Sequence, residues 1–183
     1  MSFRNPIIGN SRDDSANPLV VISLGSNLPS DRGDPIATVV SAITELGLLF
    51  QTTLKVSALW KTVPLDCPPG TPDFVNAVIS FPVPETGCPE AVLEQLQRLE
   101  NNYGRNRRLL QNASRTLDLD LISWGNQVSV SAELTLPHPR AHLRGFVLRP
   151  LAEIAPDLIL PGQTQAVDEL AAQLPDLNET IIN

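Results

Sequence analysis

The sequence predicts a single α+β domain, because short segments with strand and helix periodicity alternate along the chain without an internal repeat. The chain has 183 residues, which is enough for one domain with a substantial core. The segments follow in the order strand, helix, strand, strand, helix, strand. That order is the one found in a ferredoxin-like βαββαβ core, and the residues after it form a C-terminal extension.

The first half of this plan begins with an apolar run at 19–25, which is typical of a buried strand and ends in turn-forming residues. Asp34 and Pro35 are typical of a helix N-cap and of the first helical position. We expect this helix to stop at Gly47. Apolar and polar residues then alternate over 54–60, which predicts a strand.

The second half begins with a loop at 62–73 that contains four prolines. A second alternating strand follows at 74–81, and Pro89 opens another amphipathic helix. The segment 104–114 is a polar, arginine-rich loop, and 117–124 has strand periodicity.

The ends of the chain carry less information. Residues 1–17 are polar and irregular, and we interpret them as a disordered N-terminal tail before a domain at 18–183. The last segment, 164–183, is interpreted as a short terminal helix without chemistry of its own.

Composition excludes several classes of function. The net charge of −7 argues against a general nucleic-acid binder, which needs a basic surface. The apolar stretch at 19–24 is too short to span a bilayer, and no signal peptide precedes it. Cys67 and Cys88 lie far apart without metal-site spacing, so they favour ordinary thiols in a reducing cytoplasm.

The charge is unevenly distributed. Between Arg105 and Arg149, seven arginines stand against three acidic residues, so this span is locally +4 inside an acidic protein. The planar guanidinium suits phosphate oxygens. A solvated surface is the commoner explanation of a charge cluster, but this one favours a small anionic ligand.

The segment 115–120, RTLDLD, is the most informative. On a strand, Asp118 and Asp120 point to one face and the leucines between them to the other. Two neighbouring carboxylates repel one another unless a cation lies between them, and hard oxygens suit Mg²⁺. Two acids can also occur on an ordinary solvent-facing strand, but the adjoining arginines favour a phosphoryl-transfer site.

Three further side chains are candidates. Phe74 and Asn76 share one face of a strand and together would fit a flat heterocycle with amide-like edges, although a core Phe beside a surface Asn is commoner. His138 lies in a Pro-rich loop where it could donate to a phosphate, although a lone histidine is more often structural. The sequence contains no Walker P-loop, so a nucleotide site here would be of another type.

At this point the chain resembles the 6-hydroxymethyl-7,8-dihydropterin pyrophosphokinase family over about residues 19–161. The RTLDLD segment combined with a downstream PH…RGF pattern is the most specific part of the resemblance. The resembling segments are LGSN at 24–27, PDFVNA at 72–77, RTLDLD at 115–120, LPH at 136–138 and LRGF at 143–146.

The resemblance implies an enzyme of folate biosynthesis that transfers diphosphate from ATP to the hydroxymethyl group of the pterin and releases AMP. It implies two Mg²⁺ ions on Asp118 and Asp120, small-molecule substrates only, and a monomer. The loops 62–73 and 104–114 are expected to close over the substrates.

The resemblance also implies roles for residues beyond the two aspartates. Gln97 and Glu100 are expected on the exposed face of their helix, as ATP contacts. The other implied site residues are Arg105 and Arg115 in catalysis, Arg107, His138 and Arg144 on ATP, and Thr62, Pro64, Leu65, Phe74, Asn76 and Phe146 on the pterin.

Three alternatives remain open on residue patterns alone. A nucleotide-sensing module of the same topology would keep the arginines but would not need paired carboxylates. An RNA-binding domain would need exposed aromatic residues and a basic sheet face, which 4% aromatic residues and an acidic chain disfavour. The third alternative is an ordinary kinase that transfers one phosphoryl group. Spacing and charge cannot separate transfer of one phosphoryl group from transfer of two; only the family resemblance does.

Overall fold

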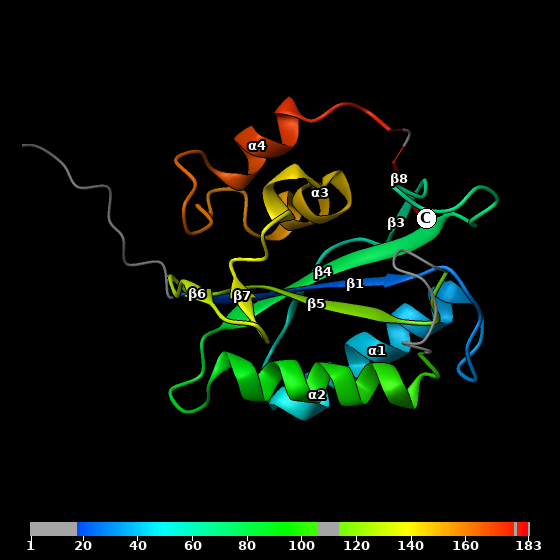
Figure 1. Ribbon diagram of the computed structural model, residues 1–183, viewed down its shortest axis with the longest axis horizontal. Coiled ribbons are helices and arrows are strands. Elements are labelled where there is room, and N and C mark those ends of the chain that lie inside the picture. Colours follow the sequence, from blue (N-terminus) through cyan, green and yellow to red (C-terminus); the bar gives the residue numbers. More distant parts are fainter. Residues whose placement is uncertain (1–17, 106–113, 178, 183) are drawn as a thin grey trace, which may run out of the picture.

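The computed structural model describes residues 18–105, 114–177 and 179–182, and its centre is an antiparallel sheet with helices on both faces (Figure 1). Among these residues, the sheet has six strands in the order β5-β1-β4-β3-β8, with β2 also pairing with β4. The strands are β1 (Leu19–Ser26), β2 (Lys55–Val56), β3 (Trp60–Thr62), β4 (Phe74–Pro82), β5 (Asp118–Trp124) and β8 (Thr180–Ile181).

The helices form two layers (Figure 1). α1 and α2 lie on one face of the sheet, and α3 and α4 lie on the other. A 3₁₀ turn and a small hairpin connect β5 to α3. The elements are α1 (Pro35–Phe50), α2 (Pro89–Asn102), α3 (Gly145–Ile154), α4 (Val167–Gln173), η1 (Ala141–Leu143), β6 (Ser129–Val130) and β7 (Thr135–Leu136). The predicted βαββαβ order and the C-terminal extension are confirmed.

Two apolar cores lie on the two faces of the sheet because β1 is buried on both sides. Val20, Ile22 and Leu24 pack into the core under α1 and α2. Val21 packs with Leu148 into the core under α3 and α4. The alternation of a strand thus sends successive apolar residues into different layers, which explains why 19–25 is an uninterrupted apolar run.

β5 carries the same alternation but changes character along its length. Leu119 and Leu121 pack into the core under α1 and α2. Near the end of the strand, Ile122 packs into the other core, against α3. At the start of the strand, the face opposite the leucines carries Asp118 and Asp120 in place of apolar side chains. The sheet therefore has an apolar end under α3 and a charged end beside it.

The first helix continues beyond its expected end. α1 runs through Gly47 to Phe50, and Gln51 ends it in the left-handed conformation with φ 50°. A glycine inside a helix costs about 1 kcal/mol relative to alanine. Burial of Leu46 and packing of Phe50 against the core offset that cost, so the prediction that Gly47 ends the helix was wrong.

The predicted strand at 54–60 is divided into β2 and β3. Between them, Ser57 uses its hydroxyl as well as its backbone: its N–H donates to Val78 O and its Oγ accepts from Val78 N, both at 3.0 Å. Glu153 of α3 accepts from Ala58 N at 2.7 Å and from the Trp60 indole at 3.0 Å. These side-chain hydrogen bonds replace ladder bonds, and the alternating pattern could not reveal them.

The C-terminal segment was also only partly predicted. It contains the expected short helix, α4, but it continues into β8, which pairs with β3 at the edge of the sheet. No helix in the described part of the chain is long and apolar enough to cross a membrane.

Candidate active site

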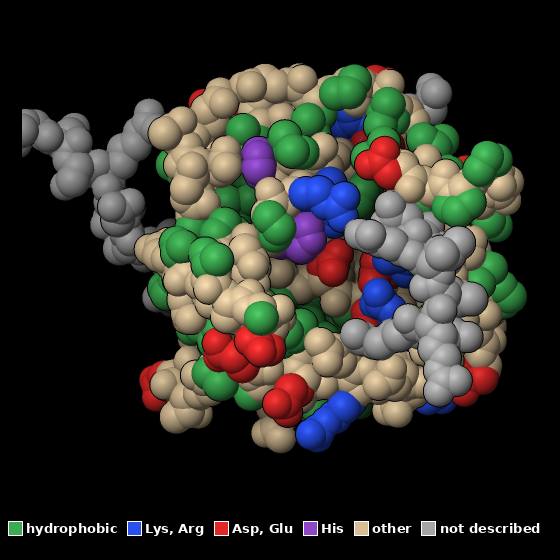
Figure 2. Space-filling model, in the orientation of Figure 1, with side chains coloured by type: hydrophobic (Ala, Val, Ile, Leu, Met, Phe, Trp, Pro, Cys, Tyr) green, Lys and Arg blue, Asp and Glu red, His purple; other side chains and the backbone are tan. Residues whose placement is uncertain are grey.

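The charged end of β5 presents two carboxylates side by side. Asp118 and Asp120 lie on the sheet face opposite Leu119, with side chains 20% and 36% exposed. Figure 2 shows acidic, basic and histidine side chains gathered in the middle of this face of the molecule. The predicted shared face of the two aspartates is confirmed, and both carboxylates are only partly exposed.

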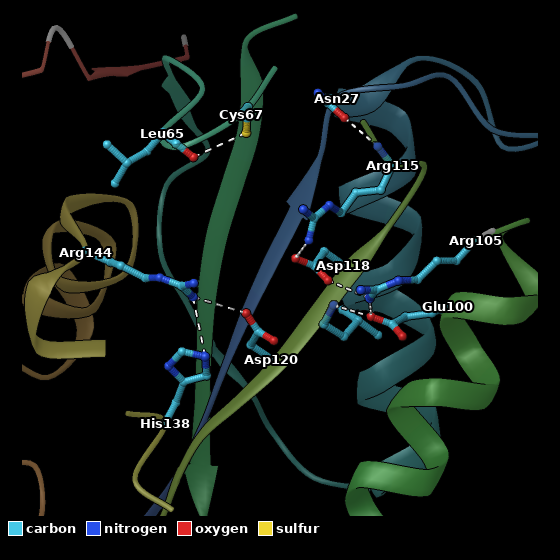
Figure 3. Close-up of polar contacts among 11 residues, drawn as sticks. Asn27, Leu65, Cys67, Glu100, Arg105, Arg115, Asp118, Asp120, His138 and Arg144 are labelled. Carbon is cyan, nitrogen blue, oxygen red and sulfur yellow. Dashed lines mark hydrogen bonds and ion pairs between the residues drawn. The ribbon is translucent and has the colours of Figure 1, made fainter. Parts of the chain in front are cut away.

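Asp118 binds two arginines, one at each carboxylate oxygen (Figure 3). Arg105 Nη1 lies 2.5 Å from Oδ1, and Arg115 Nη1 lies 2.5 Å from Oδ2. Arg105 comes from the residues after α2, and Arg115 comes from the residues before β5. Charge-assisted pairs of this kind are the stronger hydrogen bonds in proteins. The structure therefore brings together three of the predicted catalytic residues.

Asp120 faces Arg144, which comes from the other side of the site (Figure 3). Arg144 Nη1 lies 3.5 Å from Asp120 Oδ2 and 3.5 Å from His138 Nε2. His138 N donates to Ile122 O at 2.8 Å, which fixes its loop on β5. The structure thus places two of the predicted ATP residues, His138 and Arg144, on the side of the second carboxylate.

The His138 ring is arranged as a hydrogen-bond donor. Its Nδ1 accepts from Arg140 N at 3.2 Å, which favours the neutral tautomer with the proton on Nε2. In that tautomer Nε2 and Arg144 Nη1, 3.5 Å apart, are two donors that can share one anionic acceptor. Burial and the nearby guanidinium groups of Arg144 and Arg140 lower the pKa of His138 to about 4. At neutral pH the ring is therefore uncharged and offers the Nε2 proton, which suits an incoming phosphate oxygen.

Burial and the neighbouring Asp118 carboxylate raise the pKa of Asp120 to about 6, although Arg144, Arg105 and Arg115 oppose that shift. Burial also lowers the pKa of Arg144 from its usual value. The shift at Asp120 indicates that the described arginines compensate its negative charge incompletely. A ligand that brings positive charge to Asp120 would be bound favourably.

Glu100 is buried, which corrects the expectation that it lies on the exposed face of its helix. It is only 2% exposed, accepts from Leu119 N at 2.8 Å and pairs with Arg105. Its position on the helix explains the burial: it follows Leu96 by four residues and precedes Tyr103 by three, on the apolar stripe. That spacing was the sequence signal that could have revealed it. Gln97 is half-buried on the adjacent face.

The residues expected to bind a pterin lie on β3, β4 and the start of α3. Asn76 Nδ2 donates to Thr62 Oγ1 at 2.7 Å, and both side chains are buried. The Asn76 carboxamide lies over Gly25 of β1, where an added Cβ would come within 2.7 Å of Asn76 Oδ1. The close approach of this amide explains why the neighbouring strand carries a glycine.

Both candidate stacking rings have an arginine over one face. The Arg115 guanidinium lies 5.9 Å from the Phe74 ring centre, and that of Arg144 lies 5.3 Å from the Phe146 ring centre. Each arginine therefore contacts both a carboxylate and an aromatic ring. The carboxylates and the aromatic rings are therefore coupled, because movement of either arginine changes the contacts of one carboxylate and one ring.

A pocket beside this cluster brings two of the expected pterin residues together. Leu65 and Phe146 both line it, along with Val63, while the preceding Thr62 is buried and Pro64 is half-buried. The walls come from the loop after β3, the start of α3 and the C-terminal segment.

Sequence reasoning missed the role of Asn27, which holds Arg115 in place. Asn27 Oδ1 accepts from Arg115 N at 2.7 Å, while its Nδ2 donates to Pro72 O and Ser114 Oγ at 3.2 Å each. Asn27 is 3% exposed, and a buried carboxamide needs such partners. Nothing in its turn-like sequence context revealed this. Arg107 and most of the loop 104–114 lie outside the described residues.

The residues present suit magnesium ions held jointly with a phosphate ligand. The described residues contain no group of three or more His, Cys, Asp or Glu side chains arranged around a metal position. They do contain the Asp118 and Asp120 carboxylates on one face, surrounded by arginines. Mg²⁺ is usually held by one or two carboxylates together with substrate phosphates and water, so this donor set fits.

Comparisons with known proteins point to one family. Residues 21–156 match the family model described as 7,8-dihydro-6-hydroxymethylpterin-pyrophosphokinase. The chain is 41% identical over 157 residues to the 2-amino-4-hydroxy-6-hydroxymethyldihydropteridine pyrophosphokinase of Haemophilus influenzae, covering 85% of this chain and 92% of that protein. It is 38% identical over 155 residues to the enzyme of the same name from Pseudomonas aeruginosa, covering 84% and 90%.

Solved structures show the same fold. A crystal structure of an HPPK-DHPS protein in complex with substrates superimposes with a TM-score of 0.61 at 12% identity. It covers 85% of this chain and 43% of that one. An HPPK-DHPS of Plasmodium falciparum gives a TM-score of 0.62 at 12% identity, covering 88% and 44%. This chain therefore corresponds to less than half the length of those proteins.

The family match spans most of the chain, and the two bacterial relatives named above align over 92% and 90% of their lengths. The conclusion is that the chain belongs to the 7,8-dihydro-6-hydroxymethylpterin-pyrophosphokinase family, whose reaction is the transfer of diphosphate from ATP to a hydroxymethyl-dihydropterin in folate biosynthesis.

Proposed function

We propose that the charged end of β5 is where this enzyme transfers diphosphate, with Asp118 and Asp120 holding two Mg²⁺ ions and the flanking arginines holding the phosphates of ATP. The observation that carries this proposal is the convergence of Arg105, Arg115 and Arg144 on the two carboxylates. Magnesium bound there would supply positive charge to the phosphate oxygens and align them for displacement.

Arg105 and Arg115 pair with carboxylates in the structure and could pair with phosphate oxygens in their place. Arg105 and Arg115 each contact Asp118, and Arg105 also contacts Glu100. With metal ions on the carboxylates, these guanidinium groups would be available to the phosphate oxygens, whose geometry they suit. Glu100 then acts on ATP through Arg105 and not by direct contact, because it is buried. Gln97 and Arg107 remain proposed ATP contacts.

On the far side, the Nε2 proton of His138 and the Arg144 guanidinium face the same region as Asp120. We assign them to the transferred part of ATP. The neutral state of His138 at physiological pH suits a donor and not a proton acceptor, because its pKa lies at about 4.

We assign the pterin to the region between β4 and the start of α3. Phe74 and Phe146 supply aromatic faces once Arg115 and Arg144 move toward phosphate. The hydrogen-bonded pair Asn76 and Thr62 offers amide and hydroxyl groups to the pterin's amide-like edge. Pro64 and Leu65 contribute the adjoining loop.

In the chemical step, the pterin hydroxyl oxygen attacks the β-phosphorus of ATP in line, and the bond to the α-phosphate oxygen breaks to release AMP. As the new oxygen–phosphorus bond forms, the hydroxyl proton passes to an oxygen of the departing AMP phosphate, from which it is lost to solvent. The contribution of the protein is to align the two substrates and to compensate the charge on the moving diphosphate. The loops 62–73 and 104–114 are proposed to close over both substrates and exclude water.

The decisive experiment identifies the nucleotide released from ATP with Mg²⁺ and 6-hydroxymethyl-7,8-dihydropterin. AMP that appears only with the pterin, and is lost in Asp118→Ala and Asp120→Ala, supports the assignment. ADP as the product would contradict diphosphate transfer. Calorimetric titration of Mg²⁺ with an unreactive ATP analogue provides a second measurement, since both variants should lose metal-dependent nucleotide affinity. Unchanged affinity in both would place the metal ions elsewhere.

A further inference from the structure

The C-terminal segment, defined as 174–177 with 179–182, forms one wall of the pocket beside Phe146. The pocket, which Leu65 also lines, is lined from this segment by Leu174, Pro175, Leu177 and Glu179. Sequence reasoning assigned no chemistry to this segment. Its position makes it part of the surroundings of the proposed pterin site.

Glu179 is the charged residue of that wall, and it is almost completely enclosed. Its side chain is 3% exposed and binds Arg149 of α3. Arg149 also donates from Nη2 to Pro175 O at 2.8 Å, so one arginine holds the segment at two points. Burial raises the pKa of Glu179, and Arg149 opposes that shift.

The carboxylate of Glu179 lies against Gly145, the first residue of α3. An added Cβ on Gly145 would come within 2.6 Å of Glu179 Oε2 and 2.8 Å of Oε1. Glycine is needed at this position because there is no room for a side chain. Its backbone conformation does not require glycine, because φ is not positive. Gly145 lies between Arg144 and Phe146 in the sequence, so Glu179 contacts the backbone between these two residues.

The same segment also reaches the opposite wall of the pocket. β8 pairs with β3 through Trp60–Ile181 and Lys61–Thr180, and Ile182 N donates to Leu59 O at 2.8 Å. β3 leads directly into the loop that carries Val63 and Leu65. The C-terminal segment therefore joins the start of α3 to the end of β3.

We propose that Glu179 is a positioning residue for pterin binding: through Gly145 and Arg149 it holds Phe146 at the correct distance from the loop that follows β3. This inference rests on the proposed function of the site. Glu179 does not contact the reacting atoms. It acts through Phe146, which lines the same pocket, whereas Arg144 has its own contacts with Asp120 and His138. Removal of Glu179 should therefore weaken pterin binding while the ATP side of the site is preserved.

The test measures steady-state constants for Glu179→Gln, which keeps the volume of the side chain but removes its charge. We expect the KM for the pterin to rise about 10-fold, with kcat and the KM for ATP changed by less than about 2-fold. Asp176→Asn is the matched control: it removes a carboxylate from the same segment, 3.8 Å from Arg149 but 83% exposed, and should leave the pterin KM unchanged.

Gly145→Ala provides a second, independent test. In the wild-type background the added methyl group meets the Glu179 carboxylate and should raise the pterin KM. In a Glu179→Ala background the nearest atoms that the methyl group meets are gone, so the same substitution should add little. This non-additivity is the signature of direct coupling between the two positions.

The outcomes separate the two proposals. AMP release by the wild-type protein tests the proposed function. If the wild type releases no AMP, the positioning role is still tested by measuring the pterin affinity of the variants by calorimetry. A Glu179→Gln protein that unfolds at lower temperature but keeps the wild-type pterin KM would reduce Glu179 to a structural role. Additive effects of Gly145→Ala and Glu179→Ala on the pterin KM would also overturn the proposal.

Discussion

Asp118 and Asp120 lie two residues apart on one face of β5, yet the protein treats their charges differently. Asp118 binds a guanidinium group at each oxygen, both at 2.5 Å. Among the described residues, Asp120 pairs with one arginine, Arg144, at 3.5 Å, and its pKa is raised to about 6 by burial and by Asp118. The described arginines pair mainly with Asp118, so the negative charge of Asp120 is less well compensated.

This difference has a physical origin in chain connectivity. Arg115 precedes Asp118 by three residues, and Arg105 follows directly from α2, whose residue Glu100 is hydrogen-bonded to β5. The arginine at Asp120 arrives on a separate segment before α3, at a longer distance. Added positive charge, such as a metal ion, would therefore stabilise the ionised form of Asp120.

The largest expected effect comes from removing either carboxylate. Asp118→Asn and Asp120→Asn should each lower kcat by at least about 100-fold, because each removes charge that acts on the phosphates in the transition state. Steady-state AMP formation at saturating substrates measures this. If one variant retains wild-type kcat, the site needs a single carboxylate, and the comparison between them fails.

Stability without metal should separate the two variants. In EDTA, Asp118→Asn should lower the midpoint of thermal unfolding, because Arg105 and Arg115 lose a charged partner. Asp120→Asn should raise it at about pH 7.5, and the gain should shrink toward about pH 4.5. The sign follows from the raised pKa: protonated Asp120 favours the folded state at low pH, and ionisation removes that contribution as the pH rises through about 6. Equal midpoints for the two variants at both pH values would contradict the proposed difference.

Glu100 tests how Arg105 is held beside Asp118. Glu100→Ala should lower the free energy of unfolding by about 1–3 kcal/mol, because it leaves the buried Leu119 N–H without its acceptor. Glu100→Gln keeps an oxygen for that N–H but loses the charge that faces Arg105, so it should cost less. Urea unfolding of the two variants provides the measurement, and an equal loss in both would show that the charge, and not the hydrogen bond, dominates.

The smallest expected effect concerns the pterin side. Gly25→Ala would push the Asn76 carboxamide away from its present position and should raise the pterin KM about 5-fold, with the KM for ATP unchanged. Gly47→Ala is the control, since its Cβ would meet only ordinary contacts with Leu54 at 3.7 Å. Wild-type pterin KM in Gly25→Ala would show that the Asn76 position does not limit pterin binding.

Much of the fold could be predicted because its signals are local. The double-sided burial of β1 appears as an unbroken apolar run, and the alternation on β5 places Asp118 and Asp120 on one face. The helix stripe on α2 was also predicted, but Glu100 was assigned to the wrong side of it. The spacing to Leu96 and Tyr103 indicated burial, and the chemistry of a glutamate suggested exposure. The packing position decided the outcome because Arg105 and Leu119 N satisfy the carboxylate.

By itself the sequence determined the βαββαβ order and the pair of carboxylates on one strand, since both follow from the conformational preferences of neighbouring residues. Only the tertiary structure decided which arginine contacts which carboxylate, that Asn27 holds Arg115, and that Glu179 lies against Gly145. Asn27 and Arg115 are 88 positions apart, and Glu179 and Arg149 are 30 positions apart. Contacts of that range form only when the sheet and its two helical layers are assembled, and no local pattern in the sequence encodes them.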